Sequence, residues 1–562
     1  MESFSNFVSD IVRSLFQVDV VAEISRPDPR FGDLATNVAM QIVKQVGKNP
    51  RDIAEQITTK LRESSDFTDV SIAGPGFINL RLSDKYLAAE LNKMIAAPND
   101  YGKSSQYDNK IVVTEFSDPN PFKELHVGHL YTTIVGEAIS RLIETAGGEV
   151  HRVNFGGDVG LHVAKAMWGI ITNLGGENPD KLNEIPVDER SRFLSQRYVE
   201  GANAYEDDEI AKEKIIEYNA QVYKLHSEND RESPFAQIYW TCRAWSYEYF
   251  NKFYDEIGVK FEKYYPESET TPIGIRTVEE QRKRGVYEDS DGAVVFKGEK
   301  YGLHTRVFIN RNGLPTYEAK DVGLSIKKWD DYHFDESVII TGNDIIEYMK
   351  VVLKSIEQFQ PQLAQRTKHM THGNIKLAGV TKMSSRKGNV LRAVDVIEMA
   401  KNALRETQDN ADMIQVLGSI KYAFLKNTLG PDMIFDAKES VSMVGNSGPY
   451  LQYAAVRAKS ILRGLTTDFN GDYPTNFDEF ERALLVKLTE FSDAIKVATQ
   501  ELSPHLICAY LYELAQTFNR FYENSRVAGD VRENLRAQLA LVYAKFLERG
   551  LDILGIAVSE KM

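Results

Sequence analysis

The sequence predicts an α/β protein whose central part is a doubly wound parallel sheet. Two short β-branched runs, at 110–116 and 149–155, flank a helical pattern, as in a βαβ unit. A further buried-strand pattern, "ESVIITGND", follows at 336–344. Residues before about 100 mix helical and strand patterns, and those after about 410 are helical almost throughout. A chain of 562 residues is too long for one hydrophobic core, so several domains are expected.

The first block, residues 1–100, is predicted to be a small α+β domain. Its opening stretch "MESFSNFVSDIVRSLFQV" carries acidic residues early and has no cleavage-site pattern, which favours an amphipathic helix over a signal peptide. The stretch "VSIAGPGFINLRLS" predicts two strands joined by a turn at Gly74, Pro75 and Gly76. The polar, turn-rich residues 96–110 are the expected linker.

The central domain is expected to span residues 106–405. A Pro/Asn loop follows its first strand, and a helix is predicted from His126 to about Thr145, ended by Gly147 and Gly148 before the next strand. Strand, helix and strand in this order predict a right-handed βαβ crossover in a Rossmann-like parallel sheet. A charged, mostly helical insertion is predicted at about 165–300, and an all-α domain at 410–562.

Composition excludes several classes of protein. With 43% hydrophobic and 26% charged residues, the chain is neither disordered nor fibrous. It has no apolar run of eighteen residues, so no membrane is expected as a partner. Two distant cysteines form no disulfide framework and no zinc ribbon, which favours a reducing cytoplasm. The net charge of −14 argues against broad nucleic-acid binding, including DNA, but leaves one defined RNA possible.

The stretch "NPFKELHVGHLYTT" at 120–133 places His126 and His129 around Gly128 at a helix start. Zinc would need a third ligand, and none is signalled nearby, so no structural zinc is expected. Two satisfied structural histidines are the simplest alternative. The position after a parallel strand and in the first helical turn instead favours an anion such as a nucleotide phosphate. Gly128 would let a flat nucleobase approach the backbone.

A second stretch, "GVTKMSSRKGNVL" at 379–391, crowds Lys382, Arg386 and Lys387 around two serines. A basic surface loop is the ordinary interpretation. The same composition suits a strap that closes over a pyrophosphate.

The His-Val-Gly-His and Lys-Met-Ser-Ser-Arg stretches resemble the two signatures of class I aminoacyl-tRNA synthetases. Together with "TEFSDPNPFKELHVGHL", "NFGGDVGLH", "PTYEAKDVG" and "SGPYLQYAAVRAKSILR", they resemble the arginyl members of that class over nearly the whole chain. The resemblance implies an enzyme, an arginine–tRNA ligase, that makes an arginyl-adenylate from ATP with Mg²⁺. It then transfers L-arginine to tRNA(Arg), releasing AMP and pyrophosphate.

The resemblance also implies site residues. The catalytic set would be His126, His129, Lys123, Lys382 and Lys387. ATP would be bound by His126, Gly128, His129, Asp158, Met383, Ser384, Ser385 and Lys387. Arginine would be bound by Glu115, Ser117, Asn120, His129, Tyr317, Asp321 and Asn343, with Tyr317 and Asp321 one helical turn apart. The family commonly has glutamine where Asn343 and His162 stand.

The helical C-terminal block would bind the tRNA anticodon stem-loop through Tyr450, Arg457, Phe518, Tyr522 and Arg526. An aromatic stripe on a helix is more often core, so a mixture of core and RNA-facing rings is expected. The family signature also has a lysine where Ser385 stands, and we hypothesise that Lys123 supplies part of the missing charge.

Two alternatives remain open at this point. One is another class I synthetase or a related HxGH nucleotidyltransferase. The other is a catalytically silent relative that only binds tRNA.

Overall fold

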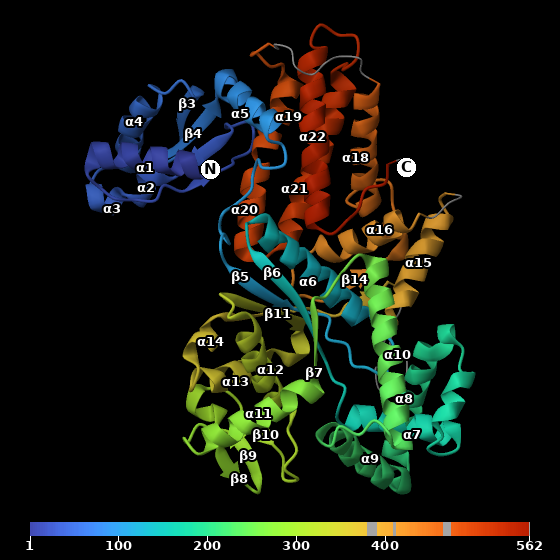
Figure 1. Ribbon diagram of the computed structural model, residues 1–562. Coiled ribbons are helices and arrows are strands. Elements are labelled where there is room, and N and C mark those ends of the chain that lie inside the picture. Colours follow the sequence, from blue (N-terminus) through green and yellow to red (C-terminus); the bar gives the residue numbers. More distant parts are fainter. Residues whose placement is uncertain (379–390, 409–411, 465–473, 561–562) are drawn as a thin grey trace.

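The structure is a computed structural model that describes residues 1–378, 391–408, 412–464 and 474–560. Its N-terminal part is an antiparallel sheet with strand order β1-β2-β4-β3, covered by helices (Figure 1). The elements are α1 Glu2–Phe16, β1 Ile24–Ser25, β2 Leu34–Thr36, α2 Val38–Gln41, α3 Val43–Val46, α4 Pro50–Leu61, β3 Phe67–Ala73, β4 Phe77–Leu82 and α5 Asp84–Ala96. The predicted strand–turn–strand is confirmed, since β3 and β4 pair around Gly74 and Gly76, both with positive φ.

The middle of the chain forms a five-stranded parallel sheet in the order β12-β11-β5-β6-β7, as the fold-class prediction requires. Its strands and the βαβ helix are β5 Ile111–Glu115, α6 Val127–Thr145, β6 Glu149–Gly156, β7 Lys263–Pro266, β11 Glu336–Gly342 and β12 Thr367–His372. From β5 the chain first goes to β6 on one side and later to β11 on the other. The strand order therefore reverses beside β5, and ligands of open α/β sheets bind outside the carboxyl ends of the strands at such a point.

The segment predicted as a mostly helical insertion is helical as far as Ile257 and again in α11 Glu267–Arg282. Its elements are α7 Leu161–Leu174, η1 Pro179–Glu184, η2 Val187–Glu189, α8 Arg190–Asp207, α9 Glu209–Ser227 and α10 Pro234–Ile257. Residues 263–266 then return to the parallel sheet as its edge strand β7. The four-residue strand "KYYP" is too short to show a period, which is why helical charge patterning concealed it.

The rest of the central region carries a second, antiparallel sheet of order β10-β9-β8 and the helices that flank the parallel one. These elements are α11 Glu267–Arg282, β8 Glu288–Ser290, β9 Ala293–Phe296, η3 Gly298–Tyr301, β10 Arg306–Ile309, α12 Tyr317–Tyr332, η4 Asn343–Ile345, α13 Ile346–Glu357 and α14 Pro361–Gln365. A separate hydrophobic cluster, which includes Tyr287, Phe296 and Phe308, joins this second sheet to α12 and α13.

The C-terminal part is helical except for one short strand. Its elements, with the strand that precedes them, are β13 Ile375–Leu377, α15 Ala393–Arg405, α16 Met413–Leu425, β14 Met433–Phe435, α17 Ala437–Ser440, α18 Gly448–Arg463, α19 Glu479–Thr489, α20 Phe491–Glu501, α21 Pro504–Asn524 and α22 Glu533–Ile553. The predicted all-α C-terminal domain is confirmed, and the short strand β14, which pairs in parallel with β13, precedes its helices α18 to α22.

The N-terminal part lies against the C-terminal helices, beside α19 and α20 (Figure 1). Arg482 of α19 donates to Asp33 at 2.6 Å, and the ring of Tyr101 stacks on Phe546 with centroids 5.4 Å apart. No described helix is both long and apolar enough to cross a membrane.

Candidate active site

The loop between β5 and α6 is under backbone strain at the carboxyl edge of the sheet. Ser117, Asp118 and Phe122 have φ of 75°, 49° and 67°, a region that side chains other than glycine rarely adopt. The insertion holds this loop in place. Ser246 of α10 accepts the Phe122 N–H at 2.9 Å, and Ser195 of α8 accepts the Glu124 N–H at 2.7 Å. Strain that the surroundings stabilise is typical of functional sites.

His126 and His129 cap the first turn of α6 reciprocally. His126 Nδ1 accepts the His129 N–H, and His129 Nδ1 accepts the His126 N–H, both at 3.2 Å. The two rings stack with centroids 3.6 Å apart. Burial, reinforced by the Lys123 ammonium, lowers the pKa of His126 to about 4, and burial, together with His126 and Lys123, lowers the pKa of His129 well below its usual value.

The tautomer of both rings follows from these contacts. A neutral imidazole whose Nδ1 accepts carries its proton on Nε2. Each ring is therefore neutral at pH 7 and retains one Nε2–H donor. Two such donors at a helix N-terminus form an anion site without adding a full positive charge.

The structure gives a steric reason for a glycine at position 128. A Cβ at this position would lie 2.8 Å from Cε1 and 2.9 Å from Nδ1 of His126. The space that a side chain would need is therefore occupied by the His126 ring. The stack of the two histidines therefore favours glycine here, and the approach of a nucleobase to this backbone stays a prediction.

Lys123 is half-buried beside the histidines and has no carboxylate partner among the described residues. Its Nζ lies 3.8 Å from the ring centroid of Tyr198 on α8. Burial and the nearby Lys165 ammonium lower the pKa of Lys123 to about 8. Sequence reasoning found Lys123 but missed Tyr198, because the two residues are 75 positions apart (198 − 123).

Asn120 and His162 both meet the backbone of Gly157 after β6. Asn120 Oδ1 accepts the Gly157 N–H at 3.0 Å, and His162 Nε2 lies 2.6 Å from the Gly157 carbonyl oxygen. Burial and the Lys123 charge lower the pKa of His162 to about 3, so this ring is neutral and donates to the carbonyl. A Cβ on Gly157 would lie 2.4 Å from Asn120 Oδ1.

Four carboxyl groups gather around the start of α12 and the end of β5; Glu115 and Glu267 are buried, and Asp118 and Asp321 are half-buried. Lys328 donates to Glu115, and Lys320 lies 2.5 Å from Glu267. Two carboxylates, Asp118 and Asp321, have no ammonium partner among the described residues. Burial and the Glu115 charge raise the pKa of both well above the usual range.

The residues predicted to bind the substrate arginine have different partners in the structure. Asp321 accepts from Tyr348, whereas Glu115 is paired with Lys328. Tyr317 begins α12 as predicted and is 58% exposed. Ser117 is buried against Tyr254 at 2.7 Å, and Asn343 donates to the Gly430 carbonyl at 2.5 Å.

Asp158 is a structural group, contrary to the prediction that it meets ATP. Its side chain is fully buried and accepts from Arg243 Nε at 2.9 Å. It also accepts from Ser268, at 2.8 Å from the backbone N–H and 2.7 Å from the hydroxyl. The carboxylate thus joins the loop after β6 to α10 and α11.

The expected pyrophosphate residues Lys382, Met383, Ser384, Ser385, Arg386 and Lys387 lie outside the described residues. The chain that follows them is tied directly to the His motif. The Val127 N–H donates to the Leu391 carbonyl at 2.9 Å, and the Ala393 N–H donates to the Leu125 carbonyl at 2.8 Å. Lys387 precedes Leu391 by four positions, a length of chain that can span at most about 14 Å.

Of the side chains predicted to bind tRNA, some lie in the hydrophobic core and others lie at the surface. Phe518 is 2% exposed and stacks on Tyr543 with centroids 3.7 Å apart, so the prediction that it contacts RNA is corrected. Arg457 lies over the half-buried ring of Tyr522 at 4.8 Å, and Arg526 is exposed. Tyr450 is half-buried and its hydroxyl accepts from Asn519 at 2.8 Å.

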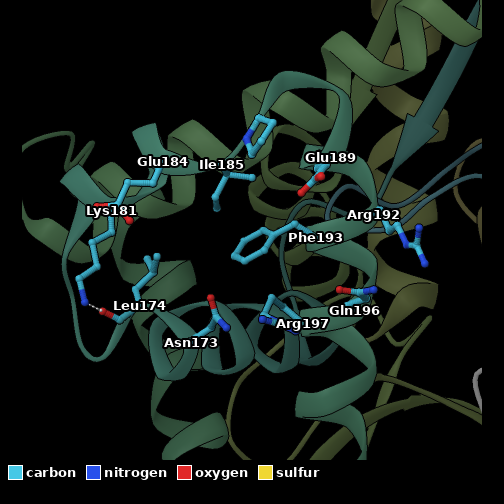
Figure 2. A pocket seen from close by; sticks show the side chains of 11 residues that line it. Asn173, Leu174, Lys181, Glu184, Ile185, Glu189, Arg192, Phe193, Gln196 and Arg197 are labelled. Carbon is cyan, nitrogen blue, oxygen red and sulfur yellow. Dashed lines mark hydrogen bonds between the residues drawn. The ribbon is translucent and has the colours of Figure 1, made fainter.

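A cavity of about 670 Å³ opens on the other side of α8, away from the His motif. Figure 2 shows the Phe193 ring pointing into it from α8, opposite Leu174 and Asn173 of α7. None of the residues predicted for ATP, arginine or tRNA lines it. In the part of the chain that the structure describes, no three His, Cys, Asp or Glu side chains gather to hold a metal ion.

Comparison with known proteins supports the resemblance. A family model described as "tRNA synthetases class I (R), catalytic domain" matches residues 90–436. The "DALR anticodon binding domain" matches 451–562, and the "Arginyl tRNA synthetase N terminal domain" matches 2–82.

Whole-chain relatives agree. The arginine–tRNA ligase of Clostridium perfringens is 30% identical over 561 residues, covering 95% of each chain. The arginyl-tRNA synthetase structures from Plasmodium falciparum and Thermus thermophilus have TM-scores of 0.81 and 0.79 at 22% identity. Both comparisons cover 100% of this chain, with 98% and 99% of the other, so the fold is the same. A catalytic-domain model that matches more than half of the chain, and a relative 30% identical along nearly its whole length, show that the protein belongs to the arginyl-tRNA synthetases of class I.

Proposed function

We propose that this chain attaches L-arginine to tRNA(Arg) in two steps at the carboxyl edge of the parallel sheet. In the first, a carboxylate oxygen of arginine attacks the α-phosphorus of ATP and pyrophosphate leaves. In the second, the 2′-hydroxyl of the terminal adenosine attacks the arginyl carbonyl, and AMP leaves. The observation that carries this proposal is the neutral, reciprocally capped His126–His129 pair at the start of α6.

The His pair is proposed to bind the phosphate region of ATP. Its two Nε2–H donors and the free N–H groups of the first helical turn would stabilise charge that develops on the phosphate oxygens. Lys123 would add one positive charge next to them. Lys382 and Lys387 would meet the leaving pyrophosphate, and the tie between Leu391 and Val127 keeps that segment within reach.

The carboxylate cluster is proposed to recognise the arginine cation. Four carboxyl groups and two ammonium groups leave two carboxyl groups, Asp118 and Asp321, without a counter-charge (4 − 2), and a bound cation would stabilise their ionised form. Arginine brings two cationic groups, the guanidinium and the α-ammonium. Asp321 would hold the guanidinium, and the exposed Tyr317 ring would pack on its plane. Glu115 would act through Lys328 and keep the cluster in place.

Asn120 is proposed to serve the amino-acid end of the substrate, next to the His motif. Ser117 and Asn343 would fix the loop and the strand edge, since their polar groups already have partners. The tRNA would meet the C-terminal helices near Arg457, Tyr522 and Arg526. Mg²⁺ would come with ATP, held by its phosphates. We also propose a cytoplasmic location, which suits the two buried free cysteines.

The test is amino-acid-dependent exchange of pyrophosphate into ATP, run with and without tRNA. Exchange that requires arginine supports the proposal. Exchange driven by a different amino acid would show another class I specificity. No exchange under any condition, with tRNA still bound, would show a silent binding protein.

A second test addresses the charge missing at Ser385. Lys123→Ala and Lys387→Ala are both expected to reduce exchange strongly. If Lys123→Ala were fully active while Lys387→Ala were inactive, Lys123 would not carry the missing charge.

A further inference from the structure

Helix α8 of the insertion contacts Lys123 and Glu124, two residues that precede the His motif. Ser195 accepts the Glu124 N–H at 2.7 Å, and the Tyr198 ring faces the Lys123 ammonium at 3.8 Å. Ser195 and Tyr198 are three apart and so share one face of α8. From this geometry we propose that Tyr198 is a positioning residue, whose ring holds the Lys123 ammonium toward the ATP phosphates. The inference rests on the function proposed above.

The position of Tyr198 is fixed by a close helix crossing. Gly169 of α7 lies against the backbone of Arg197, and Gly201 of α8 lies against the backbone of Lys165. A Cβ at Gly169 would be 2.1 Å from the Arg197 carbonyl oxygen, and one at Gly201 would be 1.9 Å from that of Lys165. Tyr198 lies between these two contacts, so its backbone has little freedom relative to α7 and to the site.

An aromatic partner suits a lysine that must meet a phosphate. The two buried lysines of the site, Lys320 and Lys328, pair with carboxylates, which cancels their charge. Among the described residues, no carboxylate lies within ion-pair distance of Lys123. A ring face attracts an ammonium through its quadrupole and leaves the full positive charge available to an anion.

The ring also affects protonation. Burial and Lys165 of α7 disfavour the ammonium of Lys123, and His126, His129 and His162 face it from α6 and α7 as neutral rings. The Tyr198 ring acts in the opposite direction, because it stabilises the charged form. Removing the ring should therefore let Lys123 lose its proton at a lower pH.

The test compares Tyr198→Leu with Tyr198→Phe in the full-length enzyme, measured by arginine-dependent exchange with tRNA. Tyr198→Phe keeps the ring face and should stay within about twofold of wild type. Tyr198→Leu should lower kcat/KM for ATP about 10-fold, the size expected for a buried cation–π contact. The alkaline limb of the pH profile of kcat/KM should also move to lower pH in Tyr198→Leu.

Tyr205→Leu is the matched control for helix integrity. It removes a similar contact on the same helix, between Tyr205 and Lys165 at 4.1 Å, and should leave exchange within about twofold. A double variant gives a second readout. In a Lys123→Ala background, Tyr198→Leu should have no further effect on kcat/KM, because the ring then has no ammonium to hold.

The outcomes separate the two proposals. Wild-type enzyme without arginine-dependent exchange would overturn the function itself. Active wild type with an equally active Tyr198→Leu would overturn only the role of Tyr198. The role of Tyr198 would also be overturned if Tyr198→Phe and Tyr198→Leu lost activity equally. It would likewise be overturned if Tyr198→Leu lost activity without a shift in the alkaline limb of its pH profile.

Discussion

Replacing Gly128 by alanine should separate activity from stability. Gly128 is in the first turn of α6 with an ordinary helical backbone, so alanine by itself would stabilise the helix by about 1 kcal/mol. The added Cβ would lie 2.8 Å from the His126 ring, which must turn away. The ring would then release the His129 N–H, and loss of that cap costs about 1 kcal/mol. The net change in the free energy of unfolding is close to zero.

The catalytic effect should be much larger. Turning His126 moves its Nε2–H away from the phosphate and disturbs the stacked His129. Loss of one preorganised donor of this kind costs about 10²-fold or more in rate. We therefore expect Gly128→Ala to lower arginine-dependent pyrophosphate exchange about 10²-fold, with a melting temperature within about 2 °C of wild type.

Gly136→Ala on the same helix is the contrasting variant. Its Cβ would lie 2.2 Å from Cγ of the fully buried Phe116, so overpacking should cost about 1–3 kcal/mol or more. This variant should melt earlier. The reasoning on Gly128 is refuted if Gly128→Ala keeps wild-type exchange, or if it loses stability as Gly136→Ala does.

Three further outcomes follow from buried groups. Asp158→Asn leaves the Arg243 guanidinium unpaired and should cost about 3 kcal/mol in urea unfolding; full stability would contradict its role as a link. Phe518→Ala opens a cavity beside Tyr543 and should cost 3–5 kcal/mol, whereas weaker tRNA binding at unchanged stability would place the ring at the RNA. His126 has a pKa of about 4 when folded and 6.5 as its ordinary value, so the unfolded chain binds the extra proton between these values. Stability should therefore fall as pH is lowered from 6.5 to 4, and His126→Asn should reduce that slope in denaturation series.

Local patterns carried most of the fold and part of the site. The His motif was predicted at a helix start, and both histidines cap that helix through contacts within four residues. The parallel strands 111–115, 149–156 and 336–342 were visible as short β-branched runs. Such features depend on neighbours in sequence, which is why they can be found without a structure.

Three of the errors involve partners that are distant along the chain. Asp158 follows a sheet strand, as a nucleotide ligand would, but its partners come from α10 and α11. Glu115 is predicted to bind arginine directly, yet Lys328 pairs with it from 213 positions away. Phe518 and Tyr522 belong to one aromatic stripe, and only the packing of α22 makes the first of them core. Periodicity identifies a face of a helix, not what covers it.

The lysines of the site show how burial and function can be distinguished. An ammonium in a protein interior needs compensation, and Lys320 and Lys328 obtain it from carboxylates. Those pairs are nearly neutral and fix the carboxylate cluster in place. Among the residues that the structure describes, Lys123 is compensated by a ring, which is a weaker partner, so its charge remains unsatisfied until an anion binds. A half-buried cation without a carboxylate in this part of the chain, beside two neutral histidines that still have donors to offer, is an arrangement that ATP phosphates would complete.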